Sequence, residues 1–355
     1  MLKKTIRRLG ALAMVLAMAV SVFAVNASAV ETVSGNAETK FDFTKTVTTD
    51  GNTYAPNTSF SYTVTNGGAG SITDANDKTV PVLAGQGGVT LTDTVFAPTI
   101  TGMTNVAASY VVTGKIVVAA NTFTTTGVYH YVVQEKSTSA YDGITYDTTN
   151  RDLYIYVVRE NGQLVVKYAI MKNGTDKSTG FVNDYGKTNQ KIHKVTVTKE
   201  VTGLLADKNK EFEFSVSVKG AAGEKYKVGY KVTADAAEQV TYVDSTETTD
   251  AEGIVKERKI KIKDTGYIVI YGLSKTDVYT VNEKDYSSEG YTTEHRENSG
   301  SITEGEKGDV DITVVNNYDT ATPGGVIMTI APYALMLVVA GAFAVVFLSR
   351  RNRAE

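Results

Sequence analysis

The chain has 355 residues, and its 36 Lys and Arg nearly balance its 39 Asp and Glu, which gives a formal net charge of −3 at pH 7. No run of basic residues is present, which argues against nucleic-acid binding, since that binding depends on clustered positive charge. The chain contains no cysteine, which excludes disulfides, cysteine-based zinc sites and thiol nucleophiles. Its three scattered histidines, and the lack of a phosphate-loop or nucleophile-elbow pattern, predict no metal, no cofactor and no ordinary enzyme.

The first 29 residues have the pattern of a secretory signal peptide. Four basic residues among the first eight precede an apolar stretch from Leu9 to Val25, and three small residues at 27–29 follow it. This order of basic, apolar and small residues is typical of a leader that is removed on export. We therefore expect a secreted protein whose mature chain begins near Val30.

The middle of the chain has an all-β pattern. Short alternating runs rich in Thr, Val and Tyr are separated by Gly, Asn, Asp and Ser, which is typical of strands joined by turns. The clearest expected strands are Phe41–Thr48, Ser59–Thr65, Val128–Val133, Leu153–Val158, Val195–Val201, Phe212–Val218 and Ile312–Val315. A loose duplication, with Thr-Lys at 44–45 and again at 198–199, predicts two tandem immunoglobulin-like β-sandwich domains at residues 37–188 and 193–319.

In the first half, alternation predicts three polar side chains inside the core. Alternate residues of a strand point to the same face. Lys45 therefore shares the apolar face of its strand with Phe43 and Val47. By the same rule Glu135 and Asn183 share faces with apolar neighbours on their own strands.

The second half repeats this arrangement with Lys199, Glu283 and Asn316. Lys199 alternates with Val197 and Val201, as Lys45 does with its neighbours. Asn317 follows Asn316 directly, and alternation favours Asn316 as the inward residue.

Two interpretations of each triad remain open from the residues. Burying an unpaired charge costs several kcal/mol, so such groups must be partnered or neutralised. The first interpretation is a buried Lys–Glu ion pair that is hydrogen-bonded to asparagine. The second is an intramolecular isopeptide bond, because burial lowers a lysine pKa and raises a glutamate pKa. The neutral amine would then attack the asparagine side-chain carbonyl and release ammonia, with glutamate as a catalyst that acts once.

Lys172 is the candidate for a surface amine that could be linked covalently to another chain. It follows the expected strand at 164–171 and comes just before the turn signal Asn173-Gly174, so we expect it to be exposed near a loop tip. Lys167 and Lys177 are the neighbouring alternatives.

The last 36 residues combine a short motif, an apolar run and a basic tail. Thr322, Pro323, Gly324 and Gly325 precede an apolar segment at 326–348, which is long enough to span a bilayer as a helix, and arginines follow it. A plain membrane anchor would explain this pattern. The segment also resembles a Gram-positive cell-wall sorting signal, which sortase cuts before the span. Gly324 stands where that family has threonine.

Both halves resemble the FctA-type isopeptide-linkage domains of Gram-positive backbone pilins. In the first half the resemblance is carried by the motifs FTKTV, VYHYVVQEK, YDGITYDTT and GFVN, and in the second half by VTVTKEVTG, DVYTVNEKDYSSEGYTT and ITVVNN. The resemblance implies Lys45–Asn183 and Lys199–Asn316 bonds, with Glu135 and Glu283 as catalysts. It also implies that Lys172 is the inter-subunit acceptor, because it lies at the family's distance before the domain-closing asparagine.

The expected function is that of a pilus backbone subunit at the cell wall. The resemblance implies a sortase, other copies of the chain, minor pilins or a tip adhesin, and peptidoglycan as partners, with a role in adhesion and colonisation. The alternative is a monomeric, sortase-anchored adhesin that binds a host protein or glycan. A minor pilin fits less well, because the resemblance extends over nearly the whole chain.

Overall fold

The computed structural model describes residues 38–73, 78–137, 141–245, 257–303, 305 and 308–319. Within these ranges the regular secondary structure consists of β-strands and one short 3-10 helix at Ser287–Glu289. The expected signal peptide, sortase motif and apolar segment all lie outside the described residues. In the part that is described, no helix is both long and apolar enough to cross a membrane.

The first domain is a sandwich of two sheets. Its strands are β1 (Thr39–Thr48), β2 (Thr58–Phe60), β3 (Tyr62–Asn66), β4 (Gly70–Thr73), β5 (Thr79–Ala84), β6 (Val89–Leu91), β7 (Thr94–Phe96), β8 (Ser109–Val118), β9 (Gly127–Glu135), β10 (Ile144–Thr145), β11 (Arg151–Glu160), β12 (Gln163–Asn173), β13 (Asp176–Lys177) and β14 (Gly180–Tyr185). One sheet has the order β10-β14-β1-β8-β6 and the other β13-β12-β11-β9-β5-β4, with β3 also paired to β9. Strands β2 and β7 form a separate pair.

The second domain is also a two-sheet sandwich. Its strands are β15 (His193–Thr202), β16 (Phe212–Lys219), β17 (Lys225–Lys231), β18 (Gln239–Asp244), β19 (Arg258–Ile262), β20 (Tyr267–Leu273), β21 (Val278–Glu283), β22 (Thr292–Glu294), β23 (Glu297–Ser301) and β24 (Val310–Asn317). The sheets have the orders β18-β17-β20-β15-β24-β22 and β19-β16-β21-β23. The prediction of an all-β chain with two tandem β-sandwiches is confirmed.

The first and last strands of each domain lie side by side. β1 pairs in parallel with β14, and β15 pairs in parallel with β24. Each domain therefore begins and ends on two neighbouring strands of the same sheet. A pulling force applied to the first strand of a domain is therefore passed directly to the last strand, through the contacts between these two strands.

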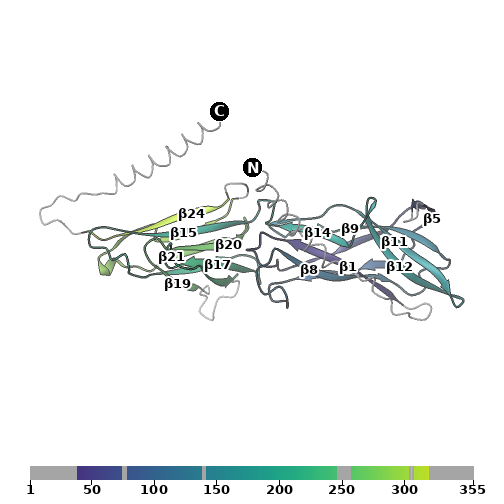
Figure 1. The fold of residues 1–355 in the computed structure, drawn as a ribbon, viewed down its shortest axis with the longest axis horizontal. Helices are drawn as coiled ribbons and strands as arrows, with labels where there is room; N and C mark the ends of the chain where they lie inside the picture. Colours follow the sequence, from purple (N-terminus) through teal and green to yellow (C-terminus); the bar gives the residue numbers. More distant parts are fainter. Residues whose placement is uncertain are drawn as a thin grey trace, which may run out of the picture.

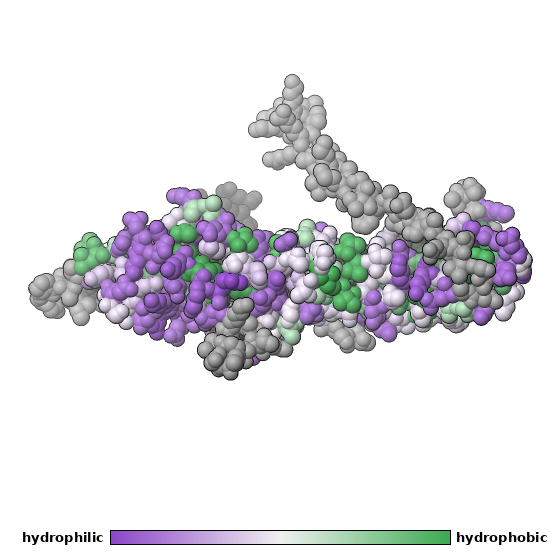
Figure 2. Space-filling view, turned by 90° about the horizontal axis from the view of Figure 1, so that it is seen from below, coloured by the Kyte–Doolittle hydropathy of each residue, from purple (hydrophilic) through white to green (hydrophobic). Residues whose placement is uncertain are grey.

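The two domains are joined end to end into an elongated molecule (Figure 1). Each domain has its own core of apolar side chains, and these cores form two separate clusters. The face in Figure 2 is mostly hydrophilic, and hydrophobic residues occur on it in small separate areas.

One expected strand is divided in the structure. The run predicted at 59–65 forms the end of β2 and most of β3, with a break at Ser61. The break separates their partners, because β2 pairs with β7 whereas β3 pairs with β9 in a different sheet. The sequence shows the alternation of this run but not that the chain changes sheets within it.

The domain junction contains a buried cluster of carboxyl and phenol groups. The Tyr141 hydroxyl of the first domain and the Tyr226 hydroxyl of the second both donate to the carboxylate of Glu224. Asp277 is 2% exposed, and its Oδ2 accepts a hydrogen bond of 2.7 Å from the backbone N–H of Ser274. Among the described residues its Oδ1 has no hydrogen-bond partner. Burial and the nearby charge of Glu224 raise the pKa of Asp277 to about 7.

We expect this raised pKa to make the second domain less stable as the pH rises. A carboxyl whose pKa is higher in the folded state contributes stability below its unfolded pKa, and that stability is lost as the pH rises through the folded pKa. For Asp277 the free energy of unfolding should fall by up to about 4 kcal/mol between pH 4 and pH 8, at about 1.4 kcal/mol per pKa unit. Urea unfolding of wild type and Asp277→Asn across this range measures the effect. A wild-type curve parallel to that of the variant would contradict it.

Candidate functional site

The lysine and asparagine of each predicted triad lie on neighbouring parallel strands, and their offset along the strands is the same in both domains. Lys45 of β1 is opposite Phe181 of β14, and Asn183 lies two residues further along. In the second domain Lys199 is opposite Val314, and Asn316 again lies two residues further along. Because side chains alternate along a strand, this offset places lysine and asparagine on the same inner face.

The glutamate of each triad comes from the opposing sheet. Glu135 ends β9 and Glu283 ends β21, and both side chains reach across the sandwich to the lysine. All six predicted residues are buried: Lys45 0%, Glu135 4%, Asn183 0%, Lys199 1%, Glu283 5% and Asn316 0% exposed. Asn317 is only partly buried and faces away, because its Oδ1 accepts a hydrogen bond from the Thr202 hydroxyl.

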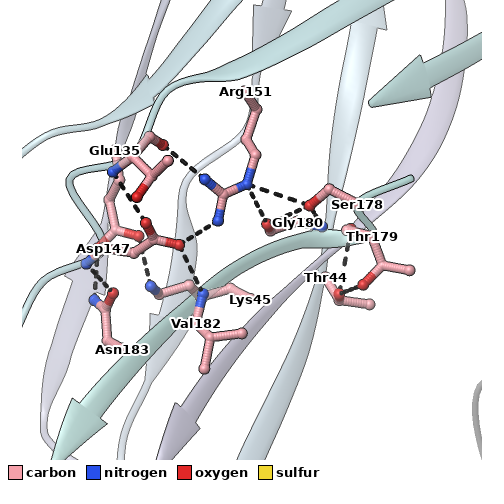
Figure 3. Close-up of polar contacts among 11 residues, drawn as sticks. Thr44, Lys45, Glu135, Asp147, Arg151, Ser178, Thr179, Gly180, Val182 and Asn183 are labelled. Carbon is pink, nitrogen blue, oxygen red and sulfur yellow. Dashed lines mark hydrogen bonds and ion pairs between the residues drawn. The ribbon is translucent and has the colours of Figure 1, made fainter. Parts of the chain in front are cut away.

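In the first domain the glutamate bridges the two groups that would react. Lys45 Nζ lies 2.5 Å from Glu135 Oε2, and Asn183 Nδ2 donates to Glu135 Oε1 at 2.6 Å (Figure 3). The other atom of the asparagine amide, Oδ1, accepts a hydrogen bond of 2.8 Å from the backbone N–H of Asp147. Lys45 Nζ also lies 4.5 Å from the centre of the Phe60 ring, so an aromatic side chain shields the amine from water.

In the second domain the same three groups are less completely hydrogen-bonded. Lys199 Nζ lies 3.5 Å from Glu283 Oε1, and it donates to the backbone oxygens of Glu200 and Val314. The Phe212 ring lies 4.6 Å from this amine. Among the described residues, neither carboxyl oxygen of Glu283 and neither side-chain amide atom of Asn316 has a hydrogen-bond partner. Buried polar atoms without partners are costly and rare in folded proteins.

Burial shifts the pKa values of both amines and both carboxyls toward their neutral forms. It lowers the pKa of Lys45 and of Lys199 to about 8 each, against the opposing attraction of the glutamates. It raises the pKa of Glu135 and of Glu283, although the lysines oppose this rise. A neutral amine beside a protonated carboxyl is the combination that nucleophilic attack on an amide requires.

Solved structures of streptococcal pilins share this fold. The chain matches the crystal structure of the major pilin from Streptococcus pyogenes with a TM-score of 0.56 at 22% identity, over 81% of this chain and 100% of that one. The major pilin T3.2 from S. pyogenes serotype GAS13637 matches with a TM-score of 0.54 at 23% identity, over 82% and 100%.

Sequence comparisons decide the family. Residues 41–186 match the Spy0128-like isopeptide containing domain, and residues 193–318 match a domain of unknown function, DUF7601. A pilin of S. pyogenes serotype M1 is 31% identical over 246 residues, which cover 65% of this chain and 69% of that protein. The chain belongs to the Gram-positive backbone pilins. This pilin is therefore a structural subunit of a cell-surface pilus.

Two residues that the sequence did not single out lie beside the first triad of this pilin. Arg151 is 5% exposed and forms an ion pair with the Asp147 carboxylate (Figure 3). Its guanidinium also donates to the backbone oxygens of Thr149 and Gly180, so it ties the segment before β11 to the start of β14. This contact fixes Asp147, whose N–H reaches the Asn183 carbonyl. Arg151 alternates with Leu153 on the apolar face of its strand, which was an available signal for its burial, whereas Asp147 lies in a loop without any periodic signal.

Lys172 is the last residue but one of β12, close to the turn that leads into β13, and it is half-buried rather than exposed. Strand β12 extends to Asn173, so the expectation that the strand ends at Met171 was wrong by two residues. Lys172 pairs with Asp152 of β11 and with Lys177 of β13. Within the described residues its Nζ forms no ion pair or hydrogen bond, whereas Lys167 Nζ lies 2.7 Å from Glu160 Oε1.

Proposed function

We propose that this pilin makes two isopeptide bonds within itself, Lys45–Asn183 and Lys199–Asn316, and is joined to its neighbours by a sortase through Gly324 and Lys172. The observation that carries the first part is the carboxyl of Glu135, which touches both the attacking nitrogen of Lys45 and the departing nitrogen of Asn183. A buried Lys45–Glu135 ion pair alone would not require the Asn183 side chain to donate a hydrogen bond to the second oxygen of Glu135.

The geometry of the first triad suggests how protons move during the reaction. Neutral Lys45 Nζ attacks the Asn183 Cγ, and the new N–C bond forms as the bond from Cγ to Nδ2 breaks. Glu135 takes up a proton from Nζ at Oε2 and delivers one to Nδ2 at Oε1, so its own proton count does not change. Nδ2 leaves as ammonia. The Asp147 N–H stabilises the charge that develops on Oδ1, as an oxyanion-hole donor does.

In the second domain the unpartnered atoms support the same reaction. Formation of the bond would remove Asn316 Nδ2 altogether and leave an amide N–H for the Glu283 carboxyl. The unsatisfied buried atoms would then decrease in number, which favours the linked state. Each glutamate acts once on its own chain, so the protein is not an enzyme with turnover.

Asp147→Pro tests the role of the backbone N–H, because proline has none. Removing one oxyanion-hole donor typically slows a reaction by about 10²-fold or more. We therefore expect freshly purified Asp147→Pro to contain chains that have lost only the ammonia of the second domain, whereas wild type has lost two. Intact mass spectrometry over time measures both bonds in one sample, so the second bond is an internal control.

Asp147→Asn keeps the N–H and is the matched variant. Because this variant loses the ion pair with Arg151 but keeps the N–H, it should lose the ammonia of the first domain faster than the proline variant does. Equal rates for the proline variant and wild type would show that the N–H plays no part in the reaction.

The proposed sortase linkage concerns the other end of the chain. It would join the Gly324 carboxyl of one subunit to an amine of the next, with wall peptidoglycan and minor pilins as further partners. Among the described residues Lys172 and Lys177 both lack an ion pair, and Lys172 is proposed because it lies at the family's distance before the domain-closing asparagine. A monomeric wall-anchored adhesin would need no such acceptor, and the similarity to pilins over both domains favours the polymer.

A further inference from the structure

Two leucines at the far end of the second domain are exposed to solvent. Leu204 is 90% exposed and Leu205 is 51% exposed, in the loop that follows β15. The Leu204 N–H donates to Asp319 Oδ1 at 2.9 Å, and the Leu205 N–H donates to the Tyr318 oxygen at 3.0 Å. The loop is thus fixed beside the last described residue of the chain. Nothing in the linkage proposed above uses these two side chains.

The outer face of β11 and β12 carries a group of aromatic side chains next to Lys172. Ile170 is opposite Tyr154, and Tyr168 is opposite Tyr156, in the same register in which Lys172 is opposite Asp152. Directly opposed residues share a face of the sheet. We call Tyr154, Tyr156, Tyr168 and Ile170 the tyrosine face.

The rings of the tyrosine face are held in place by one another and by a histidine. The Tyr156 and Tyr168 rings meet edge to face at 6.3 Å, and the His130 ring stacks on Tyr154 at 5.0 Å. Tyr168 is nevertheless 52% exposed. Ordered and exposed aromatic rings lose little conformational entropy when they are covered, which suits them to a protein contact.

These two surfaces belong to opposite parts of the molecule. Figure 1 shows β15 and β24 in one domain and β11 and β12 in the other. β15 begins at the domain junction with His193, so its ten residues place Thr202, and the leucines after it, about 30 Å from that junction. The leucines of one subunit therefore cannot reach the tyrosine face of the same subunit.

The length of the connecting chain brings the two surfaces together between subunits. Five residues, 320–324, separate Asp319 from the carboxyl that would be joined to Lys172 of the next subunit. Five residues span at most about 18 Å. Tyr168 lies four residues from Lys172 along β12, which is about 13 Å. A Gly324–Lys172 bond therefore holds the leucine loop of one copy within reach of the tyrosine face of the other.

We propose that the tyrosine face is the docking surface for the C-terminal end of a second copy of this chain, with Leu204 and Leu205 packed on Tyr156 and Tyr168. This inference rests on the proposed linkage through Lys172. Burial of the leucines removes apolar surface from water. Docking would also hold the Gly324 end of one copy close to Lys172 of the other, which raises the effective concentration of the two groups that are to be joined. The pilus would then be stiff at each junction rather than joined by a loose peptide.

The test uses introduced cysteines, because the native chain has none. A full-length chain with Leu204→Cys and Tyr168→Cys is expressed, and its wall polymers are oxidised and digested. Mass spectrometry should find a disulfide-linked peptide that contains both introduced cysteines. The control chain carries Tyr168→Cys with Val240→Cys, since Val240 is also well exposed, at 60%, but lies on β18. We expect no linked peptide from the control.

The outcomes separate this inference from the proposed function. If the Gly324–Lys172 junction peptide is present but the disulfide is absent, the linkage stands and the docking surface is wrong. If the junction peptide is absent, the linkage itself is wrong. As a second readout, the double variant Leu204→Asp with Leu205→Asp should give about tenfold less polymer, because the Gly324 end is no longer held near Lys172 of the next copy. An unchanged yield, or a Tyr168→Ala chain that polymerises normally but loses glycan binding, would overturn the docking role.

Discussion

Glu135→Ala is expected to leave the first domain without its cross-link and to lower its free energy of unfolding by several kcal/mol. A cross-link that closes a loop of roughly 100 residues stabilises a fold by about 4–5 kcal/mol. The variant also leaves Lys45 buried without its partner, and removing one member of a buried pair costs about 3–5 kcal/mol. Calorimetry should show the first domain unfolding at a much lower temperature, and trypsin should cleave it before the second domain.

Glu38→Ala is the matched control for this variant. Glu38 belongs to the same domain, but its side chain is half exposed and, among the described residues, forms an ion pair with Lys40 alone. Exposed pairs of this kind contribute at most about 1 kcal/mol. A Glu135→Ala chain with the mass and unfolding temperature of the Glu38 variant would show that no cross-link depends on Glu135.

Lys172→Ala is expected to abolish the covalent polymer. An amine must be free to attack the sortase-bound carboxyl, and Lys172 has no ion pair within the described part of the chain. Wall extracts of wild type, boiled in denaturant and probed with antibody, should give a ladder of masses. The variant should give a monomer band alone.

Lys167→Ala and Lys177→Ala are the controls for the acceptor. Lys167 is held by Glu160, and Lys177 is opposite Lys172 on β13. Both variants should polymerise as wild type does. A ladder that survives in Lys172→Ala but not in one of these would move the acceptor to that residue. A single wall-attached band in wild type would instead support the monomeric adhesin.

Strand alternation was enough to predict the main features of both domains. Lys45 and Lys199 each stand between buried valines or phenylalanines, and a period of two sends all of them to the same side. The similar order of strands in the two halves made the second triad as visible as the first. These features depend on the alternation of apolar residues along each strand, which can be read from a single sequence.

Other features depend on contacts between distant segments, which no local pattern shows. The N–H of Asp147 meets Asn183 where the Arg151 side chain joins the intervening loop to the start of β14. Lys172 pairs with β13, a strand of two residues that is too short to show a periodic pattern. The Tyr141–Glu224 contact at the domain junction likewise joins residues of two different domains that are 83 positions apart in the sequence.

The most direct measurement is the intact mass of the purified mature chain, followed by mass spectrometry of its tryptic peptides. We expect a mass lower than the calculated one by two ammonias, with one branched peptide joining Lys45 to Asn183 and another joining Lys199 to Asn316. A chain at its full calculated mass would contradict this result. It would mean that both triads are buried ion pairs and that the pilin is held together by its fold alone.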